Sequence, residues 1–230
     1  AALLGAGTVG SGVYKLVKDL EEEIISKTGA RLVVDKILVR DTTKAREGIP
    51  SELLIDRWDE ILNDPQIEIV IEVMGGIRPA LTWLEEALRA GKQVVTANKD
   101  LLAEYGEQLF DAAKAGKCDL HFEAAVAGAI PIIRPLRQSL VASELTEVMG
   151  IVNGTTNYIL TKMTEDGADY AEVLKEAQAK GFAEADPTAD VEGIDVANKL
   201  SILIALLFDQ YIPPQDIPTT GISQITGAEI

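Results

Sequence analysis

A glycine-rich segment near the start of the chain constrains the fold more than any other feature. Gly5-Ala6-Gly7-Thr8-Val9-Gly10 has the spacing G-x-G-x-x-G and follows the short apolar run Ala2-Leu3-Leu4. Apolar residues then recur at helical spacing, at positions 13, 16, 17, 20 and 24. In such a strand–loop–helix unit the glycines permit a tight turn, the approach of a pyrophosphate and close packing of helix on strand. The segment therefore predicts a dinucleotide site formed by residues 5–10, and the alternative is a merely structural glycine turn.

The first half of the chain alternates between strand-like and helical patterns. Apolar runs predict strands at 32–39, 67–73, 93–96 and 120–124, and helical spacing covers 80–90 and 102–115. Strands that alternate with helices indicate a mostly parallel sheet. After about residue 130 the pattern changes, and we expect helices at 155–163, 170–180 and 191–208 and a further strand region at 140–152. The expected fold class is α/β, with a doubly wound parallel sheet over residues 1–130 and a second domain over residues 131–230.

Composition argues against several classes of partner. The 230 residues include 37 Asp and Glu against 21 Lys and Arg, for a formal net charge of −16. Broad binding to nucleic acid or anionic lipid needs a basic face that meets the phosphates, so we expect neither partner. The apolar runs are far shorter than a membrane span, and no secretory signal is visible. A single cysteine fits a reducing compartment, and we expect a soluble, cytoplasmic protein.

The segment after the second expected strand bears on the choice between NAD and NADP. An acid at this place binds the ribose 2′-hydroxyl, whereas an arginine accommodates a 2′-phosphate. Val39-Arg40-Asp41 offers both, and Lys44 and Arg46 follow closely. Three cations favour NADP modestly, and the alternative is that they are solvated loop charges.

Two further strand ends carry candidate cofactor residues. Met74-Gly75-Gly76 ends one strand, and its glycines suit a close approach of the backbone to a cofactor. Thr96-Ala97-Asn98-Lys99 follows the next strand, at the edge where ligands bind in doubly wound sheets. Lys99 is therefore placed to reach a ligand, although a single surface lysine is usually inert.

Asp195 and Lys199 are the sharper candidates for chemistry. They lie four residues apart on an expected helix, and the same face continues into Ile202 and Leu206. A functional cleft and an ordinary surface ion pair are about equally compatible with this spacing. Several acids precede the helix and suit a substrate ammonium, although acids near a helix N-terminus are also favourable without a ligand; they are Glu184, Asp186, Asp190 and Glu192.

Cys118 and His121 are weak candidates. Cys118 could serve as the nucleophile of a phosphorylating aldehyde dehydrogenase, but no helix N-terminus is expected beside it to activate the thiol. His121 lies in the same expected strand, and one histidine with one cysteine does not make a zinc site.

Taken together, the motifs closely resemble those of the homoserine dehydrogenase family, and the resemblance covers essentially the whole chain. It begins at the glycine loop and continues through Glu72-Val73-Met74-Gly75-Gly76, Thr96-Ala97-Asn98-Lys99 and Phe122-Glu123-Ala124-Ala125-Val126-Ala127-Gly128. Its most specific stretches are Gly150-Ile151-Val152-Asn153-Gly154-Thr155-Thr156-Asn157 and Ala183-Glu184-Ala185-Asp186-Pro187-Thr188-Ala189-Asp190-Val191-Glu192-Gly193-Ile194-Asp195.

The resemblance implies a Rossmann-type NAD(P)-binding domain followed by an α+β substrate-binding and dimerisation domain, in a homodimer. It implies interconversion of L-aspartate 4-semialdehyde and L-homoserine, in the biosynthesis of threonine, methionine and isoleucine. Lys199 matches the family's acid/base lysine and Lys99 a second active-site lysine. Gly154, Thr155, Glu184, Asp190 and Asp195 match substrate-site residues. Glu123, with the carbonyls of Val126, Gly128 and Ile130, matches a site for a monovalent cation such as sodium.

Family members continue well beyond the segment that resembles Gly221-Ile222-Ser223-Gln224-Ile225-Thr226. The resemblance thus implies a catalytic region truncated on its C-terminal side. Two alternatives to the dehydrogenase remain at this point. They are a non-catalytic NAD(P)-binding sensor and a phosphorylating semialdehyde dehydrogenase that would use Cys118.

Overall fold

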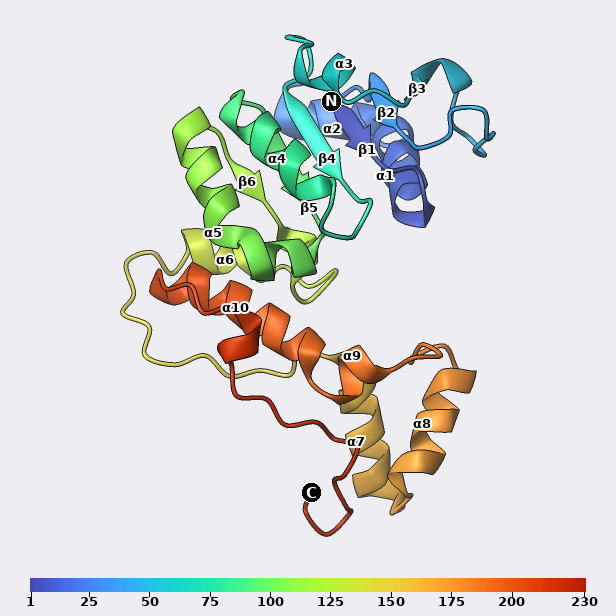
Figure 1. The fold of residues 1–230 in the computed structure, drawn as a ribbon, viewed down its shortest axis with the longest axis vertical. Coiled ribbons are helices and arrows are strands. Elements are labelled where there is room, and N and C mark those ends of the chain that lie inside the picture. Colours follow the sequence, from blue (N-terminus) through green and yellow to red (C-terminus); the bar gives the residue numbers. More distant parts are fainter. The chain divides into compact units, whose positions relative to one another are not determined.

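The computed structural model describes all of residues 1–230, and these residues form two compact units. The first unit comprises Ala1–Ala125 and the second Val126–Ile230. Figure 1 shows both units coloured along the sequence. No helix in either unit has the length and apolar character that crossing a membrane requires.

A six-stranded sheet forms the centre of the first unit. All neighbouring strands are parallel, in the order β3-β2-β1-β4-β5-β6. The strands are β1 (Ala2–Leu4), β2 (Lys36–Leu38), β3 (Leu54–Ile55), β4 (Ile69–Glu72), β5 (Gln93–Thr96) and β6 (Leu120–His121). In register, Leu3 lies between Ile37 and Ile71. This order confirms the predicted doubly wound sheet, and it reverses between β1 and β4, where such sheets bind ligands.

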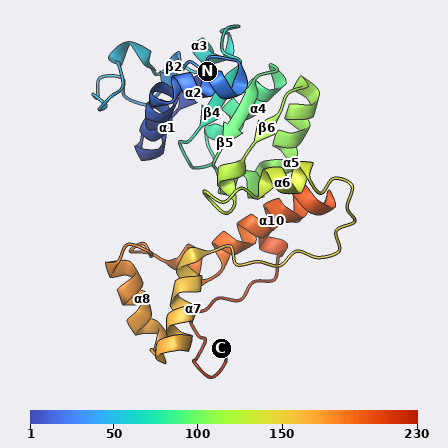
Figure 2. The ribbon, with the colours of Figure 1, turned by 180° about the vertical axis from the view of Figure 1, so that it is seen from behind.

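Helices complete the first unit, and their apolar faces explain where they pack. They are α1 (Thr8–Asp19), α2 (Glu21–Thr28), α3 (Asp59–Leu62), α4 (Ala80–Arg89) and α5 (Lys99–Gly116). The crossovers at α1 and α4 run in opposite directions along the sheet, so right-handed connections place these helices on opposite faces (Figures 1 and 2). Leu81, Leu84 and Leu88 recur at helical spacing on α4 and are buried.

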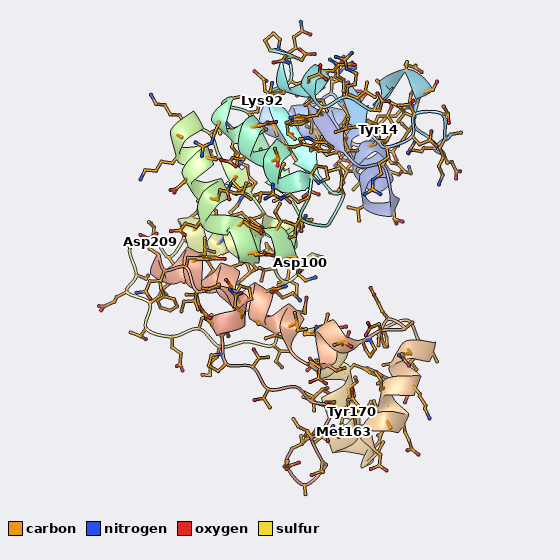
Figure 3. All side chains as sticks on the ribbon, in the orientation of Figure 1. Tyr14, Lys92, Asp100, Met163, Tyr170 and Asp209 are labelled. Atoms are coloured by element: carbon orange, nitrogen blue, oxygen red, sulfur yellow. The ribbon has the colours of Figure 1, made fainter.

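The second unit consists of helices and extended segments. The helices are α6 (Ile133–Gln138), α7 (Gly154–Asp166), α8 (Tyr170–Ala179), α9 (Thr188–Val191) and α10 (Ile194–Phe208). One core joins α7, α8 and α9 through Ile159, Met163, Val173 and Val191, and Tyr170 packs against it (Figure 3). The helix expected over 191–208 begins later, because Gly193, at φ 80°, separates α9 from α10.

The strand expected over residues 140–152 is wrong, since residues 140–143 form a turn and residues 144–152 have no regular secondary structure and form no ladder. No strand occurs anywhere in residues 126–230, so the α+β character expected for the second domain is not found in them. A strand is stabilised by hydrogen bonds to a neighbouring strand, and these residues offer none. Val141, Met149 and Ile151 are accordingly exposed, at 82%, 83% and 79%.

Candidate functional site

The glycine loop forms an open cradle between β1 and α1. Gly5 has φ 100°, and a Cβ on Gly10 would lie 2.1 Å from the carbonyl oxygen of Gly5, so both positions need glycine. A Cβ on Gly7 would meet no atom within 4 Å. Gly7 precedes α1 without a capping side chain, which leaves the first N–H groups of the helix for an anion. Thr8 and Val9 at this end are exposed, as a phosphate site requires.

A second loop, residues 74–76 after β4, lies against the glycine loop. A Cβ on Gly5 would come within 3.0 Å of Cγ and 3.3 Å of Cα of Met74. Gly75 and Gly76 have φ values of 71° and 73°, in the left-handed region that favours glycine. The structure therefore brings the two predicted cofactor segments together at the point where the strand order reverses.

Glu72, at the end of β4, holds this second loop from beneath. Its side chain is fully buried, and Oε1 accepts hydrogen bonds from the backbone N–H of Met74 (2.7 Å) and of Gly75 (3.1 Å). Oε2 accepts a hydrogen bond from the Thr96 hydroxyl at 2.6 Å. Sequence reasoning did not single out Glu72 as a site residue. The available signal was that Glu72 lies two positions after the apolar Val70, so its side chain shares a face of the expected strand with Val70.

Asn98 joins the loop to the start of α5. Its Nδ2 donates to the carbonyl of Gly76 at 2.7 Å, and its Oδ1 accepts from the backbone N–H of Leu101 at 3.2 Å, which caps the helix. The backbone N–H of Asn98 donates to the Thr96 hydroxyl oxygen at 3.0 Å. Lys99 is the first residue of α5 and is half-buried. Asn98 was also missed as a site residue, although an asparagine before a helical pattern is a capping signal.

The loop after β2 contains the residues expected to choose between NAD and NADP. Asp41 accepts hydrogen bonds from the hydroxyl and the backbone N–H of Thr43, and the hydroxyl contact above all holds the pKa of Asp41 below its usual value. Arg46 donates to the carbonyls of Asp41 and Lys44 and so braces the loop itself. Arg40 and Lys44 are exposed.

In the second unit, Lys199 and Asp195 form an ion pair on α10. Lys199 Nζ lies 2.6 Å from Asp195 Oδ2 and donates to the carbonyl of Val152, also at 2.6 Å. The side chains are only 16% and 8% exposed. Asp195 and Lys199 share a face of α10 with Ile202, which is 4% exposed. Because this face packs inward, the ion pair is shielded from solvent.

Asn153 connects this pair to a second acid. Its Nδ2 donates to Asp195 Oδ2 at 2.9 Å and to Asp190 Oδ1 at 2.7 Å. Its Oδ1 accepts from the backbone N–H of Thr156 and caps α7. Asn153 is buried and was not predicted as a site residue, although it precedes a helix as a cap does.

The remaining predicted substrate residues, Gly154, Thr155 and Glu184, differ in the contacts they make. Gly154 and Thr155 begin α7, and the Thr155 hydroxyl donates to the carbonyl of Phe182 at 2.8 Å. Glu184 lies two residues after Phe182, and its side chain is exposed. The acids that share a partner are thus Asp190 and Asp195, both hydrogen-bonded to Asn153.

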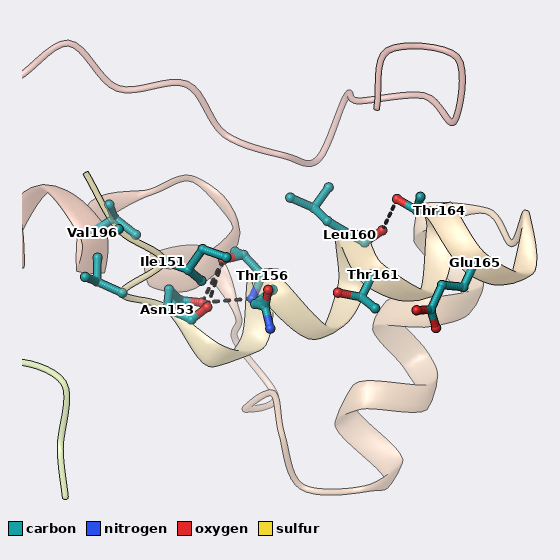
Figure 4. Close-up of a pocket in the computed structure, with 11 residues that line it drawn as sticks. Ile151, Asn153, Thr156, Leu160, Thr161, Thr164, Glu165 and Val196 are labelled. Atoms are coloured by element: carbon teal, nitrogen blue, oxygen red, sulfur yellow. Dashed lines mark hydrogen bonds between the residues drawn. The ribbon is translucent and has the colours of Figure 1, made fainter. Parts of the chain in front are cut away.

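A groove of about 480 Å³ lies along α7 and residues 150–153 (Figure 4). Its walls combine apolar side chains with hydroxyl and amide groups, from Ile151, Asn153, Thr156, Leu160, Thr161, Thr164, Glu165 and Val196 among others. Asn153 belongs both to this groove and to the Lys199–Asp195 cluster. Neither charged residue of that pair lines the groove.

The segment expected to bind a monovalent cation contains an irregular turn. Ala127 and Ala129 have φ values of 54° and 66°, and the N–H of Ile130 donates to the carbonyl of Ala127 at 2.8 Å. Glu123 lies in a short 3₁₀ helix, Glu123–Ala125, just before this turn. The binding of a cation by Glu123 and the carbonyls of Val126, Gly128 and Ile130 stays a prediction.

Cys118 is placed as a structural cysteine. Its thiol donates to the carbonyl of Leu88 at 3.2 Å, and burial raises its pKa above the usual value. His121 ends β6 with an exposed side chain.

Comparison with known proteins covers both units. The model of the homoserine dehydrogenase NAD binding domain matches residues 5–123, and that of homoserine dehydrogenase matches residues 131–230. A homoserine dehydrogenase of Bacillus subtilis is 50% identical over 99% of this chain and 53% of its own length. The crystal structure of a homoserine dehydrogenase from Thiobacillus denitrificans is 45% identical, with a TM-score of 0.89 over 99% of this chain and 53% of that one.

A more distant structure is that of a hyperthermophilic archaeal homoserine dehydrogenase in complex with NADPH. It is 25% identical, with a TM-score of 0.82, over 98% of this chain and 74% of that one. The chain spans about half the length of the curated relatives it matches. Because the two family models together cover nearly all of its residues, the chain belongs to the homoserine dehydrogenase family.

Proposed function

We propose that this chain provides the cofactor and proton-transfer residues of a homoserine dehydrogenase, which interconverts L-aspartate 4-semialdehyde and L-homoserine. The observation that carries the proposal is the largely buried Lys199 ammonium, held by Asp195 and by the carbonyl of Val152. Reduction of an aldehyde needs a proton for the developing alkoxide, and a fixed ammonium can donate it. Family membership supplies the rest of the argument.

The residues at the end of the sheet suit NAD(P). The open side of Gly7 and the uncapped start of α1 would hold the pyrophosphate, and the loop 74–76 lies beside them. When bound, NAD(P)H supplies the hydride. Asp195 and the carbonyl of Val152 use two of the three N–H donors of Lys199, so the third can be directed to the reacting oxygen.

The substrate carries an α-ammonium and an α-carboxylate, so its site needs both signs of charge. Glu184 and Asp190 are our candidates for the ammonium. Asp190 uses Oδ1 for Asn153, which leaves its other oxygen for a ligand. The backbone N–H groups of Gly154 and Thr155, at the start of the 13-residue helix α7, are candidates for the carboxylate, together with Lys99.

NADP is modestly favoured as the cofactor, because Arg40 and Lys44 are exposed after β2, where an arginine accommodates a 2′-phosphate. The archaeal relative with NADPH agrees with this choice. The oxygen donors Glu123, Val126, Gly128 and Ile130 suit a hard monovalent cation such as sodium. We also propose a cytoplasmic homodimer that acts in amino-acid biosynthesis, as the family likeness implies.

The test follows NADPH absorbance in the full-length protein with aspartate semialdehyde. Consumption of NADPH that depends on the semialdehyde supports the proposal. Tight NADPH binding without turnover would instead favour a non-catalytic sensor. Absence of both binding and turnover would contradict the cofactor site as well.

A further inference from the structure

One side chain in the first unit joins a loop and a helix that serve different parts of the proposed function. The Asn98 amide donates through Nδ2 to the carbonyl of Gly76 and accepts through Oδ1 from the N–H of Leu101. Gly76 belongs to the loop proposed to contact the cofactor, whereas Leu101 lies in the first turn of α5, which begins at Lys99. Because Nδ2 and Oδ1 belong to one planar amide, the positions of loop and helix depend on each other.

Buried groups also fix the backbone of Asn98. The Thr96 hydroxyl accepts from the Asn98 N–H and donates to Glu72, whose other oxygen accepts from the N–H of Met74 and of Gly75. Glu72, Thr96 and Asn98 are 0%, 1% and 8% exposed. The hydrogen bonds thus form a closed ring that leaves the loop at Gly75 and returns to it at Gly76. Such a fully satisfied buried network is rigid, and breaking one link leaves other buried polar groups without partners.

We propose that Asn98 is a positioning residue that fixes Lys99 relative to the cofactor loop. The inference rests on the proposed function, since it assigns roles to Lys99 and to residues 74–76. It also assigns a purpose to the Glu72–Thr96 pair, which fixes the backbone N–H of Asn98 and so the residue whose side chain joins loop and helix. A structural cap alone would need only the bond from Leu101 N to Asn98 Oδ1.

The variant Asn98→Asp separates the two bonds of this amide in the full-length protein. A carboxylate still accepts from the N–H of Leu101, so the cap is kept, but it cannot donate to Gly76. We expect the Kd for NADPH to rise about fivefold and kcat/KM for the semialdehyde to fall about tenfold or more, because a displaced loop misplaces the reacting groups. The Tm should fall by only a few degrees, because the cap at Leu101 is kept and only the Gly76 carbonyl loses its donor.

Two further variants complete the experiment. Asn98→Ala removes both bonds and should lower the Tm as well as kcat/KM. Asn63→Asp adds the same charge at an exposed position after α3 and should change neither. Parent-like Kd and kcat/KM in Asn98→Asp would overturn the proposal, and so would losses that follow the Tm across both Asn98 variants. If the parent protein binds NADPH without turnover, the proposed function fails while the NADPH measurement still tests Asn98.

Discussion

Lys199 and Asp195 form a shielded ion pair one helical turn apart on α10, with 2.6 Å between Nζ and Oδ2. An exposed pair at this spacing contributes only about 0.3–0.5 kcal/mol to stability. Here both side chains are largely buried, the carbonyl of Val152 accepts a further bond from Lys199, and Asn153 donates to the same Asp195 oxygen. The ammonium is thus held in one orientation, which suits a proton donor better than a surface contact.

Replacing Lys199 should abolish proton transfer and, because it leaves the buried Asp195 carboxylate without its counter-ion, should also lower the Tm. We expect Lys199→Ala in the full-length enzyme to lower kcat at least about 10²-fold and leave NADPH binding nearly unchanged. The matched control is Lys162→Ala, because Lys162 forms a more exposed pair with Asp166 at the same spacing on α7. Steady-state kinetics and NADPH titration measure both effects. A near-normal kcat in Lys199→Ala would refute the assignment of the proton donor.

Much of the first unit could be predicted because its signals are local. The alternation of apolar runs and helical spacing gives the strands and helices in order, and the G-x-G-x-x-G segment marks the first crossover. β3 was missed, since a strand of only the two residues Leu54 and Ile55 has no periodicity to detect. The expected strand at 140–152 failed for the opposite reason, because an apolar run cannot reveal whether a partner strand exists.

The site residues that escaped prediction depend on contacts between distant parts of the sequence. Glu72 and Thr96 are 24 residues apart, and Asn98 and Gly76 are 22 apart. Asn153 contacts acids 37 and 42 residues away. Spacing along one helix identified Asp195 and Lys199, but no spacing rule connects a capping asparagine to a loop elsewhere in the fold.

Arg40 should decide the preference between the two nicotinamide cofactors. If its guanidinium binds a 2′-phosphate, Arg40→Ala should weaken NADPH binding at least about tenfold and NADH binding much less. The control is Arg57→Ala, because Arg57 is an exposed arginine paired with Asp59. Titration of each variant with both cofactors gives the comparison. Equal losses for NADPH and NADH would show that Arg40 is only a surface charge.

Cys118 should react slowly with alkylating agents near neutral pH. Burial raises its thiol pKa, so the reactive thiolate is scarcer than in a free cysteine, whose pKa is about 8.5. The alkylation rate should therefore keep rising as the pH increases beyond that value, whereas the unfolded protein should follow the free thiol. Mass spectrometry of the Cys118 peptide measures the rate. Loss of activity in step with alkylation would revive thiol chemistry of the phosphorylating type.

The variant Glu184→Gln tests whether Glu184 binds the substrate ammonium. A charge-assisted contact contributes about 1.5–3 kcal/mol, so Glu184→Gln should raise KM about tenfold or more. Because the ammonium is remote from the reacting carbon, its misplacement should lower kcat as well.

Glu172→Gln is the control, since Glu172 is an exposed acid in the first turn of α8 and loses the same charge. If Glu184 only favours the nearby helix start, its replacement should leave KM at the parent value and reduce stability by about 0.3–1 kcal/mol. Kinetics and thermal unfolding of both variants distinguish these results, and a parent-like KM with a lowered Tm would refute the substrate role of Glu184.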